Sequence, residues 1–118
     1  MTPELLQRFI AISQQESLAQ IGDFFPHEQL NHHKQLMRLP KERWFALAEN
    51  FDSEEIVHLI RFFTAAEMKL PGWEAGAKSP VVWLVKTLRK RGTPPTRELL
   101  LWIKSNSTNK YLPNGALI

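Results

Sequence analysis

The apolar residues of this sequence recur at helical spacing, and the segments that carry them begin and end with residues typical of helix termini. Thr2-Pro3-Glu4 opens the first segment, Ser79-Pro80 opens a later one and Gly92 closes it. These residue types favour the first and last turns of α-helices. No segment alternates apolar and polar residues with a period of two, which is the pattern of a half-buried strand. The sequence therefore predicts an all-α protein.

Five to six helices follow from this pattern. We expect them over residues 3–20, 27–37, 40–49, 53–70, 80–91 and 96–104, and the helix at 27–37 should be short and polar. In the helix over 53–70 the apolar positions cover most of the circumference, which predicts a central, buried helix. Its start at Asp52-x-x-Glu55 fits a capping box.

One domain over residues 1–118 is expected, with two stacked helical hairpins behind an N-terminal helix. The segment 53–61 matches 96–104 in residue character at an offset of 43, and Pro40 and Pro80 stand at an offset of 40. This is the period of HEAT-like repeats. Two unrelated amphipathic hairpins would share the same caps and periodicity, so both interpretations stay open.

A single core is expected where the last three helices meet. Its predicted members are Ile60, Phe63, Trp83, Leu84, Leu88, Leu99 and Trp102. The run from Leu99 to Ile103 is expected to face this core. Truncating Trp83 or Trp102 to alanine should then cost about 3–5 kcal/mol.

Composition excludes several classes of protein. The chain has no cysteine, so disulfide scaffolds, cysteine-bound metals and thiol nucleophiles are excluded. The longest apolar runs, 81–85 and 99–103, are far too short to span a bilayer, and residues 1–4 lack the pattern of a signal peptide. We therefore expect a cytoplasmic protein without membrane contact.

Three groups of residues invite a comparison with known sites. The segment 72–79 has two glycines before Lys78-Ser79, but its spacing departs from a phosphate-binding loop, which leaves a connecting loop with Lys78 as a candidate anion contact. Glu55-x-x-His58 has the spacing of a di-iron ligand pair, yet the chain holds one such motif where two are needed. His27, Glu28, His32 and His33 would form at most an incomplete metal site. We predict no metal, no cofactor and no catalysis.

Basic residues gather in the C-terminal third of the chain. Residues 78–118 hold eight Lys and Arg against one acid, whereas residues 1–77 hold seven against eleven. The candidate contacts for nucleic acid are Lys86, Arg89, Lys90, Arg97 and Lys104, on one face of each of the last two helices. Alternatively these charges solvate the helices, scatter, or pair with acids such as Glu42, Glu49, Glu54 and Glu67, which is the outcome we expect.

Other residues suggest a protein partner. Trp73 lies in a loop, where it either tucks into the body or anchors a contact. Tyr111, Leu117 and Ile118 belong to an apolar tail, residues 106–118, that packs on its own domain or on a second subunit. The leading hypothesis is a small helical protein-interaction module without catalytic activity, which self-associates or binds another protein. Nucleic-acid binding through residues 86–104 is the alternative.

Overall fold

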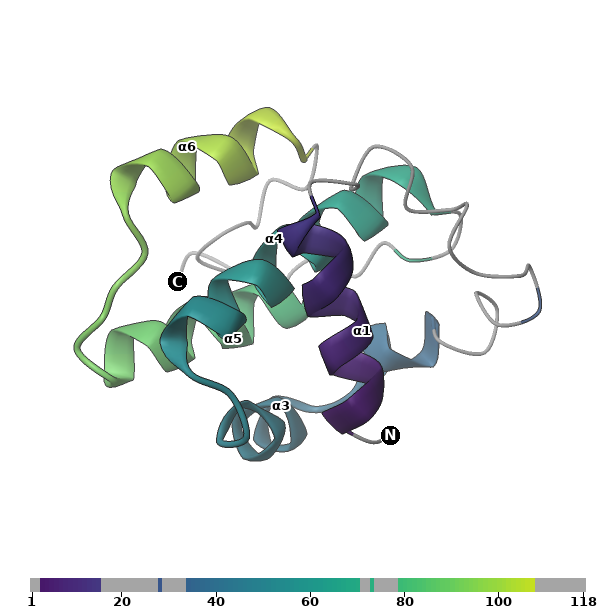
Figure 1. Cartoon of the computed structure of the whole chain (residues 1–118), viewed down its shortest axis with the longest axis horizontal. Helices are drawn as coiled ribbons and strands as arrows, with labels where there is room; N and C mark the ends of the chain where they lie inside the picture. The colour runs from purple at the N-terminus through teal and green to yellow at the C-terminus, as the bar shows by residue number, and fades with distance from the viewer. Residues whose placement is uncertain (1–2, 16–27, 29–33, 71–72, 74–78, 108–118) are drawn as a thin grey trace.

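The computed structural model describes residues 3–15, 28, 34–70, 73 and 79–107. Within them lie five α-helices and one 3-10 helix, and no strand (Figure 1). The elements are α1 (Pro3–Gln14), η2 (Lys34–Arg38), α3 (Lys41–Ala48), α4 (Ser53–Lys69), α5 (Pro80–Lys90) and α6 (Arg97–Ser105). The all-α prediction is confirmed.

The predicted starts of α4, α5 and α6 are confirmed by their hydrogen bonds, whereas Thr2, which opens the first predicted helix, lies outside the described residues. Asp52 accepts a bond from the backbone N–H of Glu55, and the Glu55 carboxylate accepts one from the N–H of Asp52, which completes the capping box at α4. Ser79 and Thr96 accept bonds from the first-turn N–H groups of α5 and α6. Gly92 ends α5 with a φ of 79°, a conformation that glycine adopts without steric cost.

Helix α4 is central, as predicted. It packs against α1 and α5, and α3 packs against α5. Aromatic rings fill the contact between α1 and α4: Phe9 stacks on Phe62 at 4.1 Å between ring centroids, and Phe63 meets Phe9 edge-on at 5.7 Å. Trp44 of α3 reaches the same group, with its ring centroid 5.3 Å from that of Phe63. One core therefore joins the N-terminal helix to both hairpins.

The tryptophans that the structure buries are not the ones predicted for the core. All seven predicted core residues belong to or contact one cluster, but Trp83 and Trp102 are only half-buried at its margin. The fully buried tryptophans are Trp44 and Trp73, each 1% exposed. On α5 the inward positions are filled by small and branched residues such as Leu84 and Val85, which leaves Trp83 on the flank.

Hydrogen bonds join the two connections that follow α3 and α5. Arg91 donates to the carbonyl oxygens of Ala48 and Phe51, and the hydroxyls of Ser53 and Thr93 lie 3.0 Å apart. Stacked hairpins bring such corners together. The HEAT-like repeat itself stays a prediction.

Two expected elements differ at their ends. The first helix ends at Gln14 in the described residues, and the rest of its predicted length, 16–20, lies outside them. In the segment predicted as a polar surface helix, η2 buries Leu36 and Met37, because two adjacent apolar residues suffice to fix a short 3-10 turn on the core.

Candidate interaction surface

Two aromatic rings meet where α3 packs on α5. Phe45 of α3 lies edge-on to Trp83 of α5, with ring centroids 6.4 Å apart and an interplanar angle of 78°. Both side chains are half-buried, so part of each remains open to solvent. An edge-on pair of this kind is the preferred geometry of aromatic contacts.

Two lysines of α5 lie over these rings. Positions 83, 86 and 90 share one face of a helix, so Trp83, Lys86 and Lys90 point in similar directions. The Lys86 Nζ lies 5.2 Å from the centroid of Trp83, and the Lys90 Nζ lies 4.4 Å from that of Phe45. These are cation–π distances. Phe45, Trp83, Lys86 and Lys90 together are termed the aromatic–cationic face.

The charges of this face have no carboxylate partner in the described part of the chain. Lys86, Lys90 and the neighbouring Arg89 are exposed, and none forms an ion pair with a carboxylate of the described residues. Of the two outcomes expected for the basic residues, pairing with Glu42, Glu49, Glu54 or Glu67 does not occur at these three cations, which leaves scatter of the charges. Glu42 and Glu49 stand three before and four after Phe45 on α3, which places two exposed carboxylates beside Phe45.

The remaining basic candidates lie elsewhere. Arg97 and Lys104 are exposed on α6, and Figure 1 shows α6 at the upper edge of the molecule and α3 at the lower edge. Arg97 and Lys104 therefore lie away from the aromatic rings that Lys86 and Lys90 contact. Lys78 lies outside the described residues.

None of the predicted partner contacts lies on the surface that the structure describes. Trp73 is buried in the core, so of its two alternatives it takes the inward one and offers no anchor to a partner. Tyr111, Leu117, Ile118 and most of the predicted tail lie outside the described residues.

Sequence reasoning missed one exposed apolar residue. In the run expected to face the core, Leu99 and Ile103 are buried, but Leu101 is 53% exposed. A helix turns by 100° per residue, so five consecutive residues cannot all point inward. Projection of 99 and 103 onto one face would have identified Leu101 as an outward residue.

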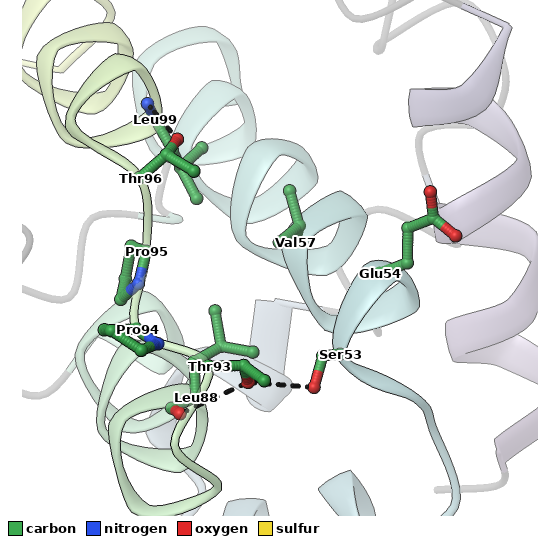
Figure 2. Close-up of a pocket in the computed structure, with 9 residues that line it drawn as sticks. All are labelled: Ser53, Glu54, Val57, Leu88, Thr93, Pro94, Pro95, Thr96 and Leu99. Atoms are coloured by element: carbon green, nitrogen blue, oxygen red, sulfur yellow. Dashed lines mark hydrogen bonds between the residues drawn. The ribbon is translucent and has the colours of Figure 1, made fainter.

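A pocket of about 310 Å³ opens beside the corners of the two hairpins (Figure 2). Apolar side chains from α4, α5, α6 and the connection between α5 and α6 line its interior: Val57, Leu88, Pro94, Pro95 and Leu99. Ser53, Glu54, Thr93 and Thr96 provide the polar lining. Pro94 and Pro95 hold the connection in an extended course, and this keeps the start of α6 away from the end of α5.

His58 serves as a link between helices. Its Nδ1 lies 2.9 Å from the hydroxyl of Ser13 on α1. Burial lowers the pKa of His58 below its usual value, the positive charge of Arg61 lowers it further, and Glu54 opposes the shift. Glu55, which shares the Glu-x-x-His spacing with His58, is bonded at the α4 cap. Among the described side chains no group of three potential metal ligands comes together, and His27, His32 and His33 lie outside them.

Comparisons with protein families, with curated proteins and with solved structures find no match for this chain. No helix within the described ranges is long and apolar enough to cross a membrane. The chemistry of the surface is therefore what bears on function.

Proposed function

We propose that this protein is a small helical interaction module without catalytic activity, and that it binds another protein through the aromatic–cationic face. The observation that carries this proposal is a half-buried aromatic pair whose two overlying lysines have no carboxylate partner in the described part of the chain. Tryptophan is among the residues that most often dominate the binding energy at protein interfaces.

The proposed lack of catalytic activity is supported by the hydrogen bonds that the interior polar side chains form with one another. His58 is held against Ser13, and the buried carboxylate of Glu67 accepts a hydrogen bond of 2.8 Å from the Ser79 hydroxyl. Ser79 also caps α5. These contacts give each group a role in joining helices. A cytoplasmic location remains our expectation on the cysteine-free composition.

Nucleic-acid binding is the second candidate. The exposure of Lys86, Arg89 and Lys90 without carboxylate partners favours it. Glu42 and Glu49 beside Phe45 oppose it, since their negative charges would repel phosphates at the same surface.

A selection of peptides displayed on phage against the full chain would test the proposal. Selected peptides should bind the wild type and lose binding to the double variant Lys86→Glu, Lys90→Glu. The matched control is Arg97→Glu, Lys104→Glu, which reverses the same number of charges on α6 and should leave binding unchanged. Circular dichroism of each variant monitors helicity. Selected peptides that bind both double variants equally would overturn the assignment of the site.

A further inference from the structure

We infer that the aromatic–cationic face recognises a partner segment in which acidic side chains flank an apolar one. This inference rests on the proposed function and specifies the chemistry of the partner. It follows from three properties of the face: its two ammonium groups, the exposed parts of its rings and the carboxylates beside it.

The two ammonium groups favour a partner with more than one acid. Lys86 and Lys90 are one helical turn apart on α5, and each ammonium lies over one ring of the pair. Each ammonium has three N–H donors, and contact with a ring face leaves donors directed outward. Holding the lysines over the rings also reduces the conformational freedom that is lost on binding. Two carboxylates on a partner segment therefore match the pair.

The rings supply the apolar part of the contact. Phe45 and Trp83 are half-buried, and the edge of one ring faces the other. An aliphatic or aromatic side chain between the two carboxylates would cover the ring area that remains in solvent. Removing such area from water favours binding. An acidic segment without an apolar residue would leave this area exposed.

The same geometry disfavours a nucleic acid as the occupant. Bases bind single-strand platforms by stacking on ring faces, whereas ring faces of Trp83 and Phe45 already carry ammonium groups. Glu42 and Glu49 add negative charge on the α3 side of the face. A folded or flexible protein segment can place a positive or neutral residue there, which a uniform polyanion cannot.

Fluorescence anisotropy with three labelled probes tests the inference on the full chain. The first probe is a synthetic peptide with a leucine flanked by glutamates, the second has glutamine at each glutamate position, and the third is oligothymidine. The glutamate peptide should bind the wild type and bind the double variant Lys86→Glu, Lys90→Glu at least about tenfold more weakly, a loss of about 1.4 kcal/mol. Arg97→Glu, Lys104→Glu should bind it as the wild type does.

Each other outcome overturns the inference. If the glutamine peptide binds as tightly as the glutamate peptide, or if no probe binds, acidic recognition is wrong, and the proposed function is still decided by the peptide selection. If oligothymidine binds more tightly than the glutamate peptide and the α5 double variant loses that binding, the nucleic-acid alternative replaces both proposals. The single variant Phe45→Ser, which leaves both lysines in place, should also weaken the glutamate peptide.

Discussion

The guanidinium of Arg91, at the end of α5, donates a hydrogen bond of 2.8 Å to the carbonyl oxygen of Ala48, the last residue of α3. A second nitrogen of Arg91 donates to the carbonyl oxygen of Phe51, also at 2.8 Å. The last carbonyl groups of a helix lack donors within the helix and lie at the negative end of its dipole. Arg91 therefore caps α3 from a neighbouring helix.

Replacing Arg91 with methionine should lower the free energy of unfolding by roughly 1–2 kcal/mol, since two bonds from a charged donor are lost at a partly solvated site. Urea denaturation monitored by circular dichroism measures this. Arg89→Met is the matched control and should change the value by less than about 0.5 kcal/mol. Equal effects of the two variants would contradict the capping role.

Trp44 and Trp83 should differ in their contribution to stability. Trp44 is fully buried, so Trp44→Ala should cost about 3–5 kcal/mol, whereas Trp83→Ala should cost clearly less because the ring is already half in solvent. Trp44→Phe keeps most of the buried ring and removes an indole N–H that finds no hydrogen-bond acceptor among the described residues, so it should fold if the alanine variant does not. The urea concentrations at the unfolding midpoints of the variants show which substitution costs more stability. A larger loss at Trp83 than at Trp44 would contradict the burial described here.

Stability should fall as the pH is lowered through the usual pKa of histidine. The pKa of His58 is lowered in the folded protein, so near and below the usual histidine pKa of 6.5 the unfolded chain binds the proton more readily. The contribution of His58 is therefore complete above 6.5 and is lost as the pH falls through its folded pKa. Urea midpoints between about pH 8 and pH 5 measure the decline. His58→Gln should show a shallower decline in stability than the wild type, because the variant lacks the contribution of His58. The other histidines titrate in both proteins, so their contribution cancels in the comparison.

An added methylene group should be tolerated at the pocket and not in the core. Val57 lines the pocket, so Val57→Leu has free space beside it and should change the free energy of unfolding by less than about 0.5 kcal/mol. The same substitution at Val85, which is fully buried, should cost about 1–3 kcal/mol. Thermal unfolding of both variants makes the comparison. Equal losses would show that Val57 has no free space beside it.

Local signals in the sequence predicted most of the fold. The caps at Asp52, Ser79 and Thr96 and the stop at Gly92 depend on neighbouring residues only, so they could be recognised without knowledge of the packing. The central position of α4 followed from its apolar circumference. These features involve residues close together in the chain.

The candidate site could be predicted only in part. Lys86 and Lys90 were recognised as a basic pair, but their contact with Phe45 depends on the packing of α3 on α5, which residue spacing within α5 does not encode. Which tryptophans fill the interior depends on the same packing. For this reason Trp73 was open to two interpretations and Trp83 was assigned too deep a position.

The stack of Phe9 on Phe62 imposes an order on folding during synthesis. Phe9 precedes Phe62 by 53 residues, so at roughly 5–20 residues per second it leaves the ribosome about 3–11 s before Phe62 does. Helix α1 is 12 residues long, a length that is marginal for an isolated helix in water, so it gains its stability only when α4 is present. Until then the apolar face of α1 is available to chaperones, and the newly made chain is most vulnerable to aggregation in that interval.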